Sequence, residues 1–170
     1  MAALVQFFIQ LCLLRRTPQE LPGSSVLLNL VFLVYLGSSF LVGLAAGLVP
    51  AVAIGQGLTD ALLTLLLLYL ALRLSGRANR FLQLATALFA AGSLLGLLAL
   101  IPLGLVAGAE SRGEQSLAGI PFLLLFFWSL LVTGHILRHG FDLRLGQGVI
   151  IALGYNLVAT TLVNGLFPGN

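Results

Sequence analysis

The chain consists of long apolar runs separated by short polar segments. The five longest runs cover residues 26–49, 51–73, 81–101, 120–137 and 146–167. A helix needs about 20 apolar residues to cross the hydrocarbon core of a bilayer, and each run reaches or approaches that length. The pattern therefore predicts an all-α protein, a polytopic membrane bundle whose five transmembrane helices form one domain over residues 26–170.

Residues that disfavour helix interiors mark the ends of these runs. Pro50 lies in a glycine-rich stretch, so we expect a tight turn there, with the regular second helix starting as late as Leu58. Pro102 is expected to end or kink the third helix because proline lacks the amide hydrogen that a helix interior needs. The polar segments 75–80 and 107–119 are predicted loops.

The N-terminal region, residues 1–25, differs from the rest. Its apolar run, 1–14, precedes its two arginines, which is the reverse of the order in a signal peptide. Fourteen helical residues reach only about 21 Å, less than the roughly 30 Å core. Gln6 and Gln10 lie one turn apart, which favours a helix lying in the membrane interface. A disordered or partly buried apolar tail is the alternative.

The charges are few but unevenly placed. Hydrophobic residues make up 59% of the chain and charged residues 8%, against about a quarter in a soluble domain. With five spans, one side of the membrane receives Arg15, Arg16, Arg73, Arg77, Arg80, Arg138 and Arg144, and the other receives Arg112 with Glu110 and Glu114. This asymmetry predicts a cytoplasmic N-terminus and an outside C-terminus. A four-span chain, with 26–73 as one re-entrant hairpin, would break it.

The chain lacks the residues that several classes of enzyme active site require. The chain has no lysine, no HExxH motif and no phosphate-binding loop, and it has only one acid within a span, so we expect no enzyme and no catalytic residues. Cys12 is the single cysteine, which excludes an intrachain disulfide. We also expect no cofactor and no metal site. The net charge of +3 is too small and scattered to indicate nucleic-acid binding.

Asp60 is that one acid within a predicted span. A charge at the bilayer centre costs roughly 2.5–3.5 kcal/mol, and nine leucines in 51–73 offset this with about 0.5 kcal/mol each. Asp60 precedes Arg73 by 13 residues, about 20 Å along a helix, which places it in the outer part of the membrane. The preferred interpretation is that Asp60 and Thr59 cap a helix. The alternative is an ion or proton site.

Other polar residues fall into two groups within the spans. Asn156, Thr160 and Asn164 follow each other at four-residue spacing, so they share a helix face that we expect to point into the bundle. The second group lies near the cytoplasmic ends of the spans, where its members could meet: Asn29, Gln83, Thr86 and His135. We interpret both groups as hydrogen-bonding contacts between helices, with His135 bonded to one of the other three. A substrate path is the alternative.

Small residues recur at four-residue spacing in two spans. Ser39, Gly43 and Gly47 lie in the first, and Gly92 and Gly96 in the third. This spacing lets helix backbones approach closely. We expect packing within one chain, with homo-oligomerisation as the alternative.

The stretch 133–144, TGHILRHGFDLR, holds both histidines and an acid. His135, His139 and Asp142 would share one face of an unbroken helix and could then bind a metal. Gly140 interrupts that face, and glycine is common just past a helix C-terminus. We therefore expect one helix to end just before Gly140 and Asp142 to cap the start of the next.

The layout as a whole resembles a known family. A short N-terminal helix, a proline-containing connector and five closely spaced spans resemble the Yip (Ypt-interacting protein) domain proteins, and the stretches RRTPQELPGS and RFLQLATALFAAGSLLGLLALIP look like small bacterial members. The DLYGP-type motif of eukaryotic members is missing. The resemblance therefore implies a five-helix membrane fold, without a trafficking role or site residues.

Two functions follow as expectations. The first is a non-enzymatic protein that binds or organises membrane lipids or a protein partner in the bacterial inner membrane, to which arginine without lysine and abundant glycine, alanine and leucine point. The alternative is a small transporter or channel subunit that uses Asp60 and the Asn156–Asn164 face. A cavity joining these residues would favour transport, whereas a filled bundle with an exposed apolar groove would favour an adaptor.

Overall fold

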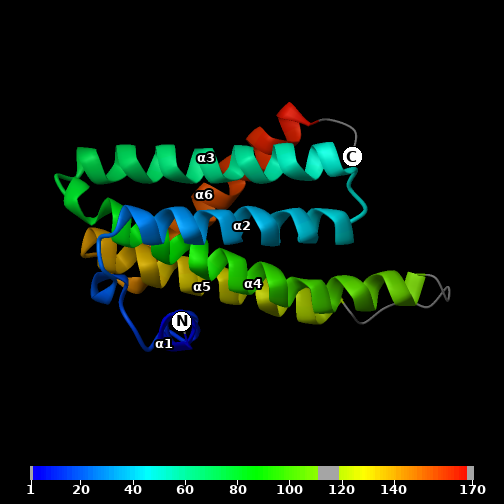
Figure 1. Ribbon diagram of the computed structural model, residues 1–170, viewed down its shortest axis with the longest axis horizontal. Helices are drawn as coiled ribbons and strands as arrows, with labels where there is room; N and C mark the ends of the chain where they lie inside the picture. Colours follow the sequence, from blue (N-terminus) through cyan, green and yellow to red (C-terminus); the bar gives the residue numbers. More distant parts are fainter. Residues whose placement is uncertain (1, 111–118, 168–170) are drawn as a thin grey trace.

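The computed structural model describes residues 2–110 and 119–167, where helices are joined by short turns and connectors (Figure 1). Its helices are α1 (Ala2–Cys12), α2 (Ser25–Ala45), α3 (Pro50–Leu74), α4 (Phe81–Glu110), α5 (Gly119–Phe141) and α6 (Leu145–Leu166), with 3-10 turns η1 (Pro18–Glu20) and η2 (Ala78–Arg80). Helices α2 to α6 are long and apolar enough to cross a membrane. The predicted all-α bundle of five spanning helices and a short N-terminal helix is confirmed.

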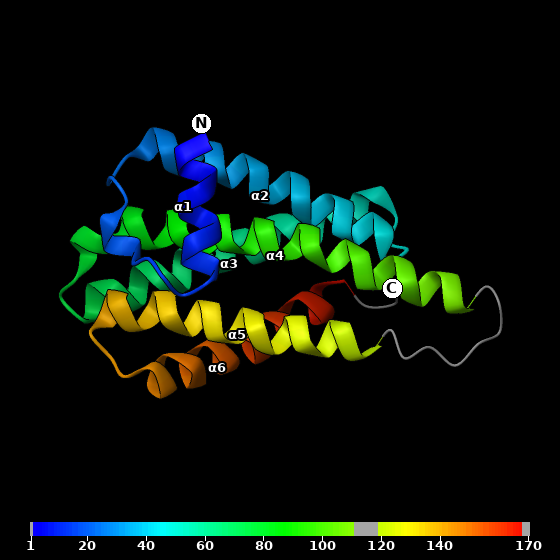
Figure 2. The ribbon, with the colours of Figure 1, turned by 90° about the horizontal axis from the view of Figure 1, so that it is seen from below.

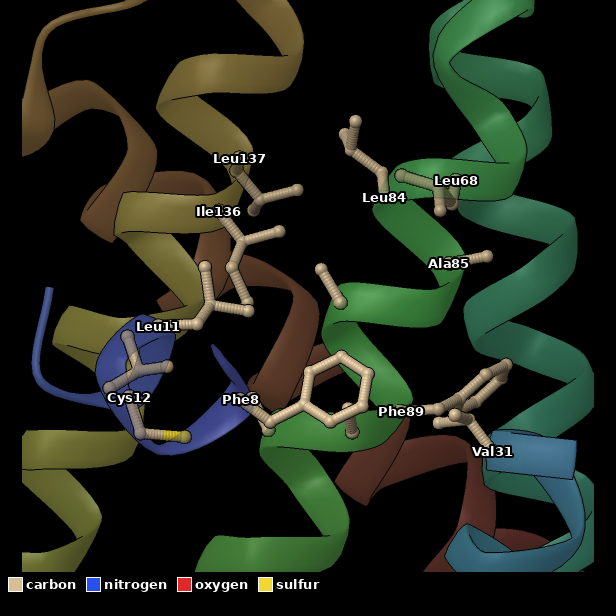
Figure 3. Close-up of a cluster of buried hydrophobic side chains, with 14 of the residues drawn as sticks. Phe8, Leu11, Cys12, Val31, Leu68, Leu84, Ala85, Phe89, Ile136 and Leu137 are labelled. Atoms are coloured by element: carbon tan, nitrogen blue, oxygen red, sulfur yellow. The ribbon is translucent and has the colours of Figure 1, made fainter. Parts of the chain in front are cut away.

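The five long helices run alongside one another, and α1 lies across them (Figures 1 and 2). Helix α4 packs against α2, α5 and α1 and forms the centre of the bundle. Around it lies a core of buried side chains that includes Leu84, Phe89 and Ile136 (Figure 3). The connections before α2, between α3 and α4 and between α5 and α6 lie at one end, called here the arginine end (Figure 2, left).

Helix α1 packs with one face on the bundle. Phe8, Leu11 and Cys12 are buried, whereas Val5 and Ile9 on the other side are exposed. Figure 3 shows Phe8 and Leu11 pointing toward the side chains of α4 and α5. Residues 2–12 are therefore an ordered helix docked against the other helices, not a disordered tail.

The same backbone motif ends four of the helices. At each, one residue adopts a positive φ, and the next amide donates to the carbonyl five residues earlier, which satisfies a carbonyl that the helix end would leave free. The positive-φ residues are Leu14, Gly47, Gly76 and Asp142, and the bonds are Arg15 to Gln10, Leu48 to Gly43, Arg77 to Leu72 and Leu143 to Arg138, at 2.8–3.0 Å. At Gly47, Gly76 and Asp142 this motif makes the short turn between two consecutive antiparallel helices.

Two predicted helix boundaries were wrong. Helix α3 is regular from Pro50, which occupies its first turn, where a missing amide hydrogen costs nothing; it does not start near Leu58. Helix α4 continues through Pro102 to Glu110. In lipid, a broken helix would expose backbone groups that no water can satisfy, so losing one hydrogen bond at proline costs less than ending the helix.

Candidate functional site

Asp60 lies in the interior of α3, ten residues after its start at Pro50. This corrects the predicted role as a helix cap, because the helix continues on both sides of Asp60. The acid is about 15 Å along the helix from Pro50 and about 21 Å from Leu74 at the other end. Asp60 is therefore well inside the span.

Two tyrosines from other helices donate hydrogen bonds to the Asp60 carboxylate. The Tyr35 hydroxyl, from α2, donates to one oxygen, and the Tyr155 hydroxyl, from α6, donates to the other at 3.2 Å. Thr64 lies one turn along α3 from Asp60; its hydroxyl pairs with Tyr155 and lies 2.9 Å from the Asp60 carbonyl. Asp60 therefore joins α2, α3 and α6.

Asp60 has no ionic counterpart in the part of the chain that the structure describes. Arg77 lines the same cavity, but it pairs with Asp142 at 3.1 Å. Phenol hydroxyls stabilise a carboxylate without neutralising it. An acid inside a membrane span is a candidate functional residue by default.

A cavity of about 860 Å³ opens beside Asp60. It extends from Asp60 and Tyr155 to Ser75 and Arg77 near the arginine end. Its apolar lining comes from α3, α4, α5 and α6, including Leu67, Leu68, Leu88, Phe89, Leu137, Phe141, Ile151 and Val158. The cavity is thus polar at Asp60 and at its Arg77 end, and its lining is otherwise mostly apolar, with Ser129 and Thr133 as exceptions.

The predicted polar face of α6 is only partly present. Asn156 lines the cavity, and its amide donates to the Ala152 carbonyl at 3.1 Å. Thr160 is exposed on the outside of α6, so the expectation that it points into the bundle was wrong. The Asn164 side chain lies outside the described residues. Because one helical turn holds about 3.6 residues, residues spaced four apart shift gradually around the helix, so they need not all face the bundle.

The second polar group does not assemble as predicted. His135 donates to the Arg16 carbonyl at 2.9 Å, and Gln83 donates to the Gln19 and Leu21 carbonyls. The Thr86 hydroxyl bonds to the Leu82 carbonyl of its own helix, and Asn29 is exposed. His135 and Gln83 therefore hold the backbone of connector 15–24 rather than each other. The expected bond from His135 to Asn29, Gln83 or Thr86 was wrong.

Residues 133–144 form the end of α5, with a different boundary from the predicted one. The helix includes Gly140, and Asp142, with φ 54°, is the residue of left-handed conformation just past its end. Asp142 does not cap α6, whose N-cap is Arg144. Glycine was expected to supply the left-handed residue, but Asp142 adopts that conformation and pairs with Arg77 and Arg80.

Side chains from elsewhere satisfy the last carbonyls of α5. Gln19 donates to the His139 carbonyl at 2.7 Å, Arg80 donates to the His139 and Gly140 carbonyls at 3.1 Å, and Arg77 donates to the Phe141 carbonyl at 2.7 Å. The two histidine rings pack edge to face, 4.8 Å apart. No group of three metal-binding side chains converges within residues 2–110 and 119–167.

The small residues have separate roles. A Cβ at Gly43 would lie 2.8 Å from the Ala53 Cβ, and Ser39 lies against Gly57, so these positions bring α2 close to α3. A Cβ at Gly92 would lie 2.9 Å from the Tyr35 ring, and one at Gly96 would be at ordinary distance from Val42. Gly47 is not a packing residue: it lies just past α2 with φ 84° and has open space around it.

The structure adds three hydrogen-bonding residues around Asp60 that the sequence pattern did not predict, namely Tyr35, Tyr155 and Thr64. A tyrosine inside an apolar span is a signal in itself, because a buried hydroxyl needs a hydrogen-bond partner. Which helices face Asp60 depends on the packing of the bundle, and that is not visible in one sequence.

Comparison of the chain with protein-family models, with curated proteins and with solved structures gave no match. The resemblance to the Yip-domain proteins therefore stays a prediction. The chain is a multi-span helical membrane protein by the length and composition of its helices.

Proposed function

We propose that this membrane protein binds a small organic cation at Asp60 and is a small transporter or a transporter subunit. The observation that carries the proposal is the Asp60 carboxylate, which faces a cavity of about 860 Å³ and has no cationic partner in the described residues. A cation at this point would supply the missing charge.

The aromatic residues around Asp60 support an organic cation. Tyr35 and Tyr155 line the same cavity as the carboxylate. Aromatic rings attract quaternary ammonium groups through the negative potential of their faces. A carboxylate between two phenols therefore offers both charge and apolar surface to such a group.

The cavity also supports the second of the two functions that the sequence suggested, transport. It joins Asp60 to Asn156, which is the described member of the Asn156–Asn164 face that lines it, and such a cavity supports transport over a closely packed adaptor. A carboxylate that binds either a proton or a cation, but not both, would couple the movement of one to the other. We place the protein in a bacterial inner membrane because it has arginine without lysine and abundant glycine, alanine and leucine. We place its arginine end in the cytoplasm because of the arginine distribution.

The test is tetramethylammonium binding to the purified protein in detergent, measured by calorimetry. Asp60→Asn should weaken binding roughly tenfold or more, because tetramethylammonium has no N–H group and is attracted to Asp60 by charge alone. Two unit charges about 4 Å apart attract each other by about 4 kcal/mol at an effective dielectric constant of about 20, and about 1.4 kcal/mol corresponds to a tenfold change. Tyr35→Phe and Tyr155→Phe should weaken binding less, because each keeps its ring.

The matched control is Glu20→Gln, which removes a negative charge from an exposed residue outside the cavity. It should leave binding unchanged. An Asp60→Asn protein that folds and binds tetramethylammonium as tightly as the unmodified protein would remove the proposal.

A further inference from the structure

A second, smaller cavity of about 270 Å³ lies between α4 and α5. These helices lie side by side in Figure 2. The residues that line only this cavity are apolar or glycine: Ala91, Leu95, Gly96, Ala99, Phe122, Leu125 and Phe126. We call this cavity the α4–α5 groove.

The α4–α5 groove adjoins the main cavity. Leu88 and Gly92 of α4 and Ser129 and Thr133 of α5 line both. Among the described residues, Ser129 and Thr133 supply the side-chain hydroxyls of the groove, and both lie at this junction. The groove is therefore an apolar extension that is entered beside two hydroxyl groups.

Tyr35 connects the junction to the acid. Its ring packs against Gly92, where a Cβ would approach the ring to 2.9 Å, and its hydroxyl donates to Asp60. One tyrosine side chain therefore separates the carboxylate from the lining of the groove. A ligand held at Asp60 would lie close enough for an attached apolar group to enter.

We propose that the substrates are lipophilic cations, with one positive centre at Asp60 and an apolar group of several carbons in the α4–α5 groove. This inference rests on the proposed function. A second charge on the ligand would meet no partner in the groove and would lose its hydration there. An uncharged apolar ligand would leave Asp60 unpaired.

The test compares two cations that share a trimethylammonium head, tetramethylammonium and hexyltrimethylammonium. Ala99→Leu places bulk in the groove and should weaken hexyltrimethylammonium binding about fivefold or more, as overfilling of a packed site does. Tetramethylammonium binding should not change. Each cation also partitions into the detergent micelle, to the same extent with every variant. The affinities of different variants for one cation can therefore be compared directly.

Gly104→Leu is the control, since it adds at least as much bulk to α4 at a position where a Cβ would meet nothing within 4 Å. It should leave both affinities unchanged. If Ala99→Leu does not fold, Ala99→Val narrows the same groove with less bulk, and a smaller loss confined to the hexyl compound is expected.

The outcomes separate the two proposals. If Asp60→Asn binds both cations normally, the proposed function fails. If Asp60→Asn weakens both while the Ala99 variants bind hexyltrimethylammonium normally, the site at Asp60 stands and the groove proposal is overturned. Loss of a co-purified lipid from Ala99→Leu, with unchanged hexyltrimethylammonium affinity, would assign the groove to an acyl chain and would also overturn it.

Discussion

Asp142 shows how one residue can serve both the backbone and the electrostatics of a turn. Its positive φ lets α5 end and the chain reverse toward α6. Its carboxylate contacts Arg77 and Arg80, which lie in the turn between α3 and α4. Aspartate tolerates the left-handed conformation better than most residues because its short side chain hydrogen-bonds locally. Glycine would suit the backbone but would leave the two arginines without their acid.

The ion pairs of Asp142 predict a pH dependence. The hydrogen bond from Arg80, with the charges of Arg80 and Arg77, holds the pKa of the Asp142 carboxyl below its ordinary value of 3.8. A group whose pKa is lower in the folded state stabilises that state fully above the ordinary pKa, and the contribution is lost as the pH falls through the folded value. Thermal unfolding of the unmodified protein in detergent should therefore show a loss of stability below about pH 4.

Asp142→Asn should lose less stability than the unmodified protein below about pH 4, because asparagine has no carboxyl group to protonate. Because the site is exposed, the variant should be only slightly less stable than the unmodified protein at neutral pH. Asp142→Gly and Asp142→Ala both lack the charge, so the greater loss expected for alanine would measure the backbone strain alone. Identical acid profiles for Asp142→Asn and the unmodified protein would contradict the role of the ion pairs.

At the scale of helices, glycines decide how closely α5 and α6 approach. A Cβ at Gly134 would lie 2.8 Å from the Val149 amide nitrogen, and a Cβ at Gly148 would collide with the Gly134 carbonyl. Both contacts involve backbone, which cannot move aside as a side chain can. Gly140, which the sequence suggested as a turn residue, instead admits the Leu84 side chain of α4.

Gly148→Ala should therefore destabilise the bundle by about 1–3 kcal/mol, the usual cost of overpacking. The matched control is Gly146→Ala on the same helix, where a Cβ would meet nothing within 4 Å. It should leave stability unchanged or slightly raised, because alanine favours helix over glycine. The measurement is thermal unfolding of both variants in one detergent; equal stabilities would show that α5 and α6 can separate at no cost.

The comparison of α3 with α5 shows what the sequence could predict. Hydropathy and length were enough for the existence of both helices, because spanning lipid requires a continuous apolar run. The exact ends of these helices could not be predicted, namely the start of α3 at Pro50 and the end of α5 before Asp142. Each end depends on backbone hydrogen bonds that several residue types can make. The partners of Asp60 depended on tertiary packing, since Tyr35 and Tyr155 lie 25 and 95 residues away along the chain.

At the scale of the whole molecule, the arginine end is both charged and tied together. Connector 15–24 is held by His135 and Gln83, and the end of α5 is held by Gln19, Arg77 and Arg80. The described residues at this end include Arg15, Arg16, Arg73, Arg77, Arg80, Arg138 and Arg144. Arg112, expected at the other end, lies outside the described residues.

This gathering of arginines predicts the orientation of the protein. Positive residues in short loops are retained in the cytoplasm during insertion, so the arginine end should be cytoplasmic and the far ends of α2, α4 and α6 should face the other side. An alkaline phosphatase fused after Asn170 should be active, because that enzyme needs export. The same enzyme fused after Arg77, in the turn between α3 and α4, should be inactive. Reversed activities of the two fusions would show the opposite orientation, and equal activities would contradict a single fixed orientation with five spans.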